Sequence, residues 1–256
     1  MPYPASDSLR RRLTPPVSSI TAYDYPMARL CDEAGIQMIL VGDSLGMMVA
    51  GLEDTTGVTL EMMEYHTEIV RRGVKNAVLV SDLPINTYRS PEEAIRSATC
   101  LMEVGADAVK LEGGLGQVEK VKALSDHGIA VCAHIGMLPQ RVREEGGYKK
   151  KGKLEKEADR LVESAEALED AGAFAIVLES MVASVAARVT DAVDIPTIGI
   201  GAGHDCDGQI RVLHDVIGGF PWFVPPFAKV HGNTAEVIRD SLDRYLEEIS
   251  ESEAEN

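Results

Sequence analysis

The amino-acid sequence predicts an α/β fold of the (β/α)8 type, a TIM barrel. Two observations lead to this prediction. Short, almost continuously apolar segments alternate with longer amphipathic segments, which is typical of a parallel sheet covered by helices. Eight such alternations fit within 256 residues, which matches one closed barrel better than an open, doubly wound sheet.

Each strand candidate is an apolar run that ends in a polar or glycine-containing turn. In chain order, the candidates are residues 19–24, 38–44, 77–84, 108–114, 130–136, 174–180, 196–203 and 222–227. The eighth, WFVPPF, is the least regular because proline cannot donate a hydrogen bond within a sheet.

Amphipathic segments separate these strand candidates. Residues 59–73 place Leu60, Met63 and Val70 on one side, as an amphipathic helix requires. The segment SPEEAIRSATCLMEVG opens with a serine that can cap a helix and a proline that the first turn accepts. Further helices are predicted at residues 115–127, 155–171, 181–193, 209–217 and 233–249.

No segment of linker composition divides the chain, so we expect one barrel domain over residues 1–256. Residues 1–17 are expected to form a flexible arm, and the acidic residues 250–256 a frayed tail after the last helix. The segment 137–154 is longer than an ordinary barrel connection, and we interpret it as a lid.

Composition narrows the classes of partner. The formal net charge of −16, from 41 acidic and 25 basic residues, argues against binding to nucleic acid or to anionic membranes. No apolar run approaches the roughly 20 residues of a membrane-spanning helix, and MPYPASDSLRRRL lacks the apolar core of a signal peptide. We therefore expect a cytoplasmic location.

The cysteines are widely spaced, and no C-x-x-C pair or zinc-finger spacing occurs. They are Cys31, Cys100, Cys132 and Cys206. We expect reduced thiols rather than a zinc site or a redox pair.

Five strand candidates end in polar residues that share a face with apolar ones. Since alternate residues of a barrel strand point inward, Asp43 is expected on the inner face with Ile39 and Val41. The same alternation applies to the other four strands. The residues that it brings to the C-terminal mouth, where barrel enzymes carry their chemistry, are Asp43, Asp82, Lys110, Glu112, His134 and Glu179.

One lysine cannot balance the four carboxylates of this set. Either the charges neutralise one another around Lys110 or reach solvent, or the surplus binds a cation, and we favour the cation. Hard oxygen ligands suit Mg²⁺, which takes one or two carboxylates and leaves positions for water and substrate oxygens. We interpret His134 as a hydrogen-bonding residue of the pocket rather than as a ligand.

Many short segments of the chain match one known family. They are ITAYDYPMA, LVGDSLGM, YHTEIVRRG, DLP, VKLEGG, GGYK, LE at 178–179, IPTIGIGAG, DGQI and FAK. Each is weak by itself, but together they resemble the ketopantoate hydroxymethyltransferase family over nearly the whole span from residue 19 to residue 229.

The resemblance implies a reaction. A hydroxymethyl group is transferred from 5,10-methylenetetrahydrofolate to 3-methyl-2-oxobutanoate, which gives 2-dehydropantoate (ketopantoate) for pantothenate and coenzyme A biosynthesis. The basic segment YKKKG leaves a related, modified pterin open as the donor in place of folate. The implied assembly is a homodecamer, a pentamer of dimers.

The resemblance also implies roles for individual residues. Mg²⁺, one ion per subunit, is bound by Asp43, Asp82 and Glu112. The 2-oxo acid contacts Asp43, Asp82, Ser44 and Lys110. Glu179 is the implied general base, which removes the proton on C3 of the 2-oxo acid.

Two other functions fit parts of this pattern. A Mg²⁺-dependent carbon–carbon lyase of the phosphoenolpyruvate and isocitrate lyase type shares the barrel and the 2-oxo acid chemistry, but the chain lacks a KKCGH-like motif. A non-catalytic metabolite-binding barrel is expected to show gaps among the carboxylates at its mouth, and none is found in this sequence.

The net charge of −16 also predicts halophilic behaviour. Repulsion among exposed carboxylates opposes the compact state in dilute buffer, and salt screens it. Melting temperature and activity are therefore expected to rise from dilute buffer to molar KCl. Equal values at low and at molar KCl would rule out salt adaptation.

Overall fold

The barrel is closed and its strands are parallel. The structure, a computed structural model, describes residues 3–254. The strands are β1 (Val17–Thr21), β2 (Met38–Val41), β3 (Val78–Asp82), β4 (Ala108–Glu112), β5 (Val131–Gly136), β6 (Ala173–Glu179), β7 (Thr197–Ile200) and β8 (Gly208–Arg211). They follow one another around the barrel in chain order, which confirms the predicted fold class.

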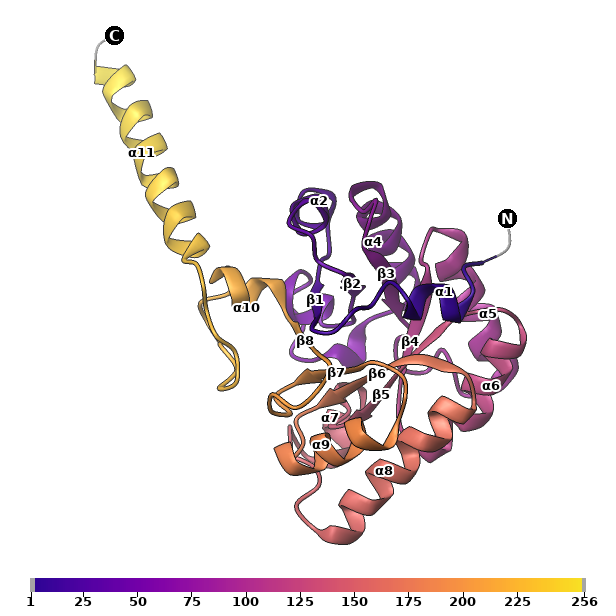
Figure 1. Ribbon diagram of the computed structural model, residues 1–256. Helices are drawn as coiled ribbons and strands as arrows, with labels where there is room; N and C mark the ends of the chain where they lie inside the picture. The colour runs from indigo at the N-terminus through magenta and orange to yellow at the C-terminus, as the bar shows by residue number, and fades with distance from the viewer. Residues whose placement is uncertain (1–2, 255–256) are drawn as a thin grey trace. The chain divides into compact units, whose positions relative to one another are not determined.

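Helices surround the strands, as Figure 1 shows for α4, α5, α6 and α8. The helices are α1 (Ser6–Arg10), α2 (Tyr25–Glu33), α3 (Leu45–Met48), α4 (Leu60–Gly73), α5 (Pro91–Glu103), α6 (Val118–Asp126), α7 (Val142–Glu145), α8 (Glu155–Asp170), α9 (Ala183–Ala192), α10 (Leu213–Ile217) and α11 (Thr234–Ala254). Short 3-10 segments are present at η1 (Thr55–Gly57), η2 (Leu115–Gln117) and η3 (Pro139–Arg141). The predicted cap at Ser90 is present, because its side chain accepts a hydrogen bond from the Glu93 backbone.

The inward-facing residues form one apolar core. Register pairing places Leu40 beside Val80, and both belong to this core. The inner face of β2 therefore carries Leu40, whereas the sequence argument expected Ile39 and Val41 there and was wrong by one residue. Because β2 ends before Asp43, the turn after the strand, and not strand alternation, positions that carboxylate.

The described part of the N-terminal segment, residues 3–17, packs on the barrel through two leucines, where we expected a flexible arm over residues 1–17; residues 1 and 2 lie outside the described residues. Leu9 is 0% exposed and Leu13 is 3% exposed, and both join the core cluster near the first residues of β1, β2 and β3. α1 also contacts β6. The open lower end of a barrel exposes apolar side chains, and these two leucines cover it. Their burial could not be predicted from the sequence, because three arginines separate the two leucines and no apolar pattern surrounds them.

The eighth strand lies at Gly208–Arg211 and not at the predicted residues 222–227. Val17 donates a backbone hydrogen bond to the Asp207 carbonyl oxygen at 2.8 Å beside it. A Cβ at Gly208 would lie 2.3 Å from the Val17 carbonyl oxygen, so this close approach of the chain requires glycine. Residues 222–227 form no strand, and Trp222 is 77% exposed.

The chain divides into two compact units, of which the first ends at Ile210 and the second begins at Arg211. The second contains α10 and α11. α11 continues to Ala254, so the expected tail at residues 250–256 is helical as far as the structure describes it. One barrel domain over residues 1–256 stays a prediction. No described helix combines the length and the apolar character needed to cross a membrane.

Replacing Leu9 by alanine tests whether the N-terminal segment belongs to the core. A fully buried leucine typically loses about 2 to 5 kcal/mol on truncation to alanine, so urea denaturation is expected to show a loss in this range. The matched control is Leu30→Ala, because Leu30 is 59% exposed. An equal, small effect of both substitutions would contradict the packing of this segment.

Candidate active site

The polar residues predicted at the mouth converge there. Asp43, Asp82, Lys110, Glu112 and His134 are all buried, with at most 4% of each residue exposed. The side chain of Glu179, at the end of β6, is 16% exposed and faces the same space, 3.5 Å from the His134 ring. Neighbouring parallel strands that end at one level bring these side chains together.

Lys110 lies at the centre of the cluster. Its Nζ is 2.7 Å from Asp82 Oδ1 and 3.9 Å from Glu112 Oε1. Burial by itself lowers the pKa of Lys110, but the surrounding carboxylates outweigh burial and raise this pKa above the ordinary value. The lysine therefore stays charged, although it is removed from water.

The carboxyl groups carry more negative charge than Lys110 can balance. Burial, and then repulsion from Asp82, raises the pKa of Asp43 to about 7. Burial also raises the pKa of Asp82, against the opposing effect of Lys110, and raises that of Glu112 well above its usual range. Such shifts mean that full ionisation of the cluster is costly without a further cation.

These residues fit a divalent cation of the Mg²⁺ type. Asp43 and Asp82 are adjacent, since the Asp43 backbone N–H donates to Asp82 Oδ2 at 3.0 Å. Two carboxylates are enough for Mg²⁺, which fills its other positions with water and substrate oxygens. Among residues 3–254, however, no three carboxylate, imidazole or thiol groups stand close enough to hold an ion by themselves. Glu112 is thus not assembled with the two aspartates as a closed ligand set.

His134 is a neutral, hydrogen-bonding residue. Its Nε2 lies 2.9 Å from the Met137 carbonyl oxygen and donates to it. Its Nδ1 lies 3.4 Å from Lys110 Nζ and accepts from it. Burial lowers the pKa of His134 well below its usual value, and the charge on Lys110 lowers it further. The ring links Lys110 to the base candidate Glu179 on β6.

Gln140 is a site residue that the sequence argument missed. Its Nε2 donates to Asp43 Oδ2 at 2.8 Å and to the Leu83 carbonyl oxygen at 3.0 Å. Its backbone N–H donates to Glu112 Oε2 at 3.1 Å. Tyr88 donates its hydroxyl hydrogen to the Gln140 side-chain oxygen. In the sequence, Gln140 lies in the segment predicted as a lid, and a glutamine after a proline has no diagnostic spacing.

Ser44 lies in the turn that carries Asp43. Its hydroxyl is 2.8 Å from the Tyr23 hydroxyl, so it is oriented from β1's side of the mouth. A Cβ at Gly42 would lie 3.5 Å from Asp82 Oδ2, which shows that this turn runs directly beside the carboxylates. The sequence GDS therefore places a backbone N–H, a carboxylate and a hydroxyl at one point of the rim.

Glu179 has the properties of a base held away from water. Burial raises its pKa to about 8, and the neighbouring charges of Lys110 and the aspartates act in opposite directions on it. A carboxylate with a raised pKa accepts a proton more readily than an exposed one. Unlike the other acidic residues of the mouth, it keeps some exposure, so a ligand can reach it.

The segment 137–154 crosses the rim of the mouth and contains η3 and α7. Arg143 Nε is 2.6 Å from Asp54 Oδ2, so this segment is joined to the loop after α3. The Lys151 backbone forms an isolated bridge to Met181, after the end of β6. Both contacts place the segment where a lid would lie, and its movement stays a prediction.

Sequence comparison identifies relatives over nearly the whole chain. A profile of the family described as ketopantoate hydroxymethyltransferase matches residues 7–254. A 3-methyl-2-oxobutanoate hydroxymethyltransferase of Pyrobaculum aerophilum is 50% identical over 249 residues, which cover 94% of this chain and 95% of that protein. The enzyme of the same name from Clostridium botulinum is 49% identical over 237 residues, 92% of this chain and 86% of that one.

Solved structures with the same fold are more distant in sequence. Phosphonopyruvate hydrolase superposes with a TM-score of 0.65 at 14% identity, over 93% of this chain and 88% of that one. 2,3-Dimethylmalate lyase, a member of the PEP mutase/isocitrate lyase superfamily, gives a TM-score of 0.61 at 18% identity, over 98% and 100%. These two similarities show the fold alone. From the profile match and the relatives near 50% identity, we conclude that the chain belongs to the ketopantoate hydroxymethyltransferase family.

Proposed function

We propose that this protein transfers a hydroxymethyl group to 3-methyl-2-oxobutanoate and so forms 2-dehydropantoate for pantothenate synthesis. The observation that carries the proposal is the buried cluster around Lys110, in which carboxylates exceed cations. Family membership points to the same reaction. An anionic 2-oxo acid can enter such a cluster only together with positive charge, and Lys110 supplies part of it.

In this proposal, Asp43 and Asp82 hold Mg²⁺, and Glu112 supports the site from β4 through Gln140. When bound, the ion supplies a Lewis acid for the oxygens of the 2-oxo acid. Lys110 holds the substrate by charge, and Ser44 offers it a hydroxyl at the rim. The hydrogen bonds of Gln140 to Asp43 and to the Leu83 carbonyl keep the carboxylate in place between turnovers.

Glu179 moves the proton. Its carboxylate takes the hydrogen from C3 of the 2-oxo acid, and the electron pair left on C3 forms a carbon–carbon bond with the one-carbon unit of the donor. Both bonds from that unit to the donor nitrogens break. Water supplies the hydroxyl group of the product and a hydrogen to one of these nitrogens, and the proton held by Glu179 goes to the other. His134 stabilises the neighbouring charges as a neutral group, because its Nε2 proton is engaged with Met137.

The proposed donor is 5,10-methylenetetrahydrofolate or a related pterin, and the proposed location is the cytoplasm. We also propose a homo-oligomer. α11 exposes apolar side chains at helical spacing, since Ile238, Leu242, Tyr245 and Ile249 are each more than 40% exposed. A helix with an apolar stripe of this kind is stable when another surface covers it.

A carbon–carbon lyase remains the alternative function. The solved lyases and hydrolases share the barrel, but they are less than 20% identical to this chain. The relatives near 50% identity carry the transferase name. Incubation with Mg²⁺, methylenetetrahydrofolate and 3-methyl-2-oxobutanoate, followed by detection of 2-dehydropantoate, separates the two functions, because a lyase forms no such product.

Substitution of the two aspartates tests the metal site. Asp43→Asn and Asp82→Asn keep the size of each side chain but remove its charge, so Mg²⁺ affinity and activity are expected to fall strongly. Asp43→Asn is expected to keep the fold, because it leaves the buried Lys110–Asp82 ion pair intact. Calorimetric titration with Mg²⁺ measures the first effect. The control is Asp126→Asn, on an exposed ion pair of α6. Unchanged Mg²⁺ affinity in both site variants would exclude the assignment.

The same site predicts a pH-dependent stabilisation by Mg²⁺. The pKa of Asp43 is raised in the folded state, so ionisation of this group lowers the free energy of unfolding as the pH rises from its ordinary pKa through about 7. A bound cation offsets this loss. The increase in Tm on adding Mg²⁺ is therefore expected to be larger at about pH 8 than at about pH 5, and to be smaller in Asp43→Asn. A pH-independent increase would contradict the coupling.

Proton exchange isolates the role of Glu179, because the donor is not needed for it. With Mg²⁺ and 3-methyl-2-oxobutanoate in D₂O, the C3 proton is expected to exchange for deuterium, and the rate is expected to rise with pH through about 8 as Glu179 ionises. Glu179→Gln keeps the size but cannot accept the proton, so a loss of roughly 10² to 10⁴ in rate is expected.

NMR follows this exchange, and Glu163→Gln on the exposed side of α8 serves as the control. Substrate affinity is expected to change little, since Lys110 holds the acid. Exchange in Glu179→Gln as fast as in the parent would assign the base to another group.

A further inference from the structure

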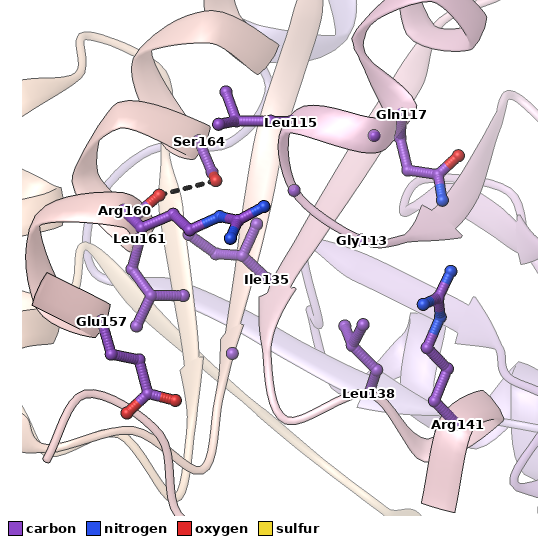
Figure 2. Close-up of a pocket in the computed structure, with 13 residues that line it drawn as sticks. Gly113, Leu115, Gln117, Ile135, Leu138, Arg141, Glu157, Arg160, Leu161 and Ser164 are labelled. Atoms are coloured by element: carbon purple, nitrogen blue, oxygen red, sulfur yellow. Dashed lines mark hydrogen bonds between the residues drawn. The ribbon is translucent and has the colours of Figure 1, made fainter. Parts of the chain in front are cut away.

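A second cavity lies beside the mouth, with a volume of about 310 Å³. Figure 2 shows it between the glycine-rich loop at residues 113–117, the end of β5 and α8. Its size is at the lower end of the range for small-molecule sites. None of the roles assigned above to the mouth uses the residues that line this cavity.

The cavity adjoins the catalytic mouth through two strand ends. Gly113 directly follows Glu112 at the end of β4, and Gly136 at the end of β5 pairs in register with Glu179. On the other side, Arg141 directly follows Gln140, which contacts Asp43 and Glu112. A molecule that reacts near Glu179 could therefore extend into this cavity without crossing the barrel.

Two arginines face the cavity. Figure 2 shows the guanidinium groups of Arg141 and Arg160 pointing into the space below the glycine loop, from the β5 side and from α8 respectively. Within residues 3–254, neither guanidinium forms an ion pair, whereas Arg29, Arg89 and Arg188 pair with carboxylates on their own or adjacent helices.

The carboxylate that lines the cavity does not cancel this charge. Glu157 Oε2 accepts hydrogen bonds from the backbone N–H groups of Gly152 at 2.8 Å and Lys153 at 3.2 Å. In Figure 2 its carboxylate points away from the guanidinium of Arg160. In a chain with a net charge of −16, two unpaired arginines at one cavity make a local positive site.

The rest of the lining is apolar. Leu115, Ile135, Leu138 and Leu161 contribute side chains between and beside the arginines. The backbone of the glycine-rich loop packs directly on α8, since a Cβ at Gly114 would lie only 2.5 Å from Ser164 Oγ. The combination suits a ligand that has a flat or apolar stem and ends in an anion.

We propose that this cavity binds the carboxylate tail of the pterin one-carbon donor, with Arg141 and Arg160 on the carboxylates and the leucines against the stem. The inference rests on the proposed function, and it adds where the donor binds. Arginine matches a carboxylate with two parallel N–H groups, which a lysine cannot reproduce. The donor thus enters over the ends of β4 and β5, and its reactive end reaches Glu179.

A comparison of two donors tests the proposal. Methylenetetrahydropteroate lacks the glutamate of methylenetetrahydrofolate but keeps the pterin. In the parent enzyme, the KM for the pteroate donor is expected to be about tenfold higher than that for the folate donor, as for loss of one hydrogen bond to a charged group. In Arg160→Ala and Arg141→Ala, the folate KM is expected to rise toward the pteroate KM, so the difference between donors shrinks.

Arg160→Lys is expected to retain part of the KM difference between the two donors, because lysine keeps the positive charge. The control is Arg96→Ala, at an exposed arginine on α5, and it is expected to leave this KM difference unchanged. Equal KM values for the two donors in the parent enzyme, or an unchanged ratio in both alanine variants, would overturn the proposal. So would a loss of proton exchange in Arg160→Ala, because exchange requires only the 2-oxo acid site.

Direct binding separates this inference from the proposed function. Calorimetric titration with p-aminobenzoylglutamate needs no turnover, and binding by the parent that is lost in Arg160→Ala supports the cavity even where no 2-dehydropantoate forms. Absence of binding, or equal competition by inorganic phosphate, would overturn the assignment to a carboxylate tail. Formation of 2-dehydropantoate without tail binding would overturn the inference alone.

Discussion

The ion pair between Lys110 and Asp82, 2.7 Å apart and almost fully buried, is the interaction on which the mouth of this barrel depends. Two charges taken out of water are costly unless their geometry is good and their remaining atoms are bonded. The register of β3 and β4 supplies that geometry, because Asp82 and Lys110 are direct partners across the two strands. Asp43, Glu112 and His134 then meet a charge that is already fixed.

The cost of unbalanced buried charge also explains why an amide, Gln140, contacts the carboxylates of the mouth. An amide carries no charge, so it can contact Asp43 and Glu112 at once without adding to the imbalance. It reaches them from η3, outside the strands, and Tyr88 and the Leu83 carbonyl bond its remaining side-chain groups. The segment after β5 thus belongs structurally to the carboxylate cluster, even though it lies in a loop of the chain.

The residues of the candidate site can be identified from the sequence, although strand alternation does not place all of them. Alternation holds along β3 and β4, so Asp82 and Lys110 lie where a period of two places them. Alternation fails for Asp43, because Leu40 and not Val41 faces the inside of the barrel on β2. The turn GDS after the strand places Asp43 beside Asp82 at the mouth. The prediction of Asp43 therefore depends on the family resemblance, whose segment LVGDSLGM includes this turn.

The misses have a common physical cause. β8 is four residues long and depends on a contact with Val17, nearly 200 positions away, so local hydrophobicity carries little signal for it. The burial of Leu9 and the contacts of Gln140 are also long-range, and neither shows in a periodic pattern.

The net charge of −16, visible in the composition, affects how ligands approach the site. In the proposed reaction, two anionic ligands approach a protein whose net negative charge repels them. In the roles proposed here, Lys110 binds the 2-oxo acid as a buried point charge whose position is set by carboxylates, whereas Arg141 and Arg160 bind the donor tail beside the mouth with the planar, two-pronged geometry of a guanidinium.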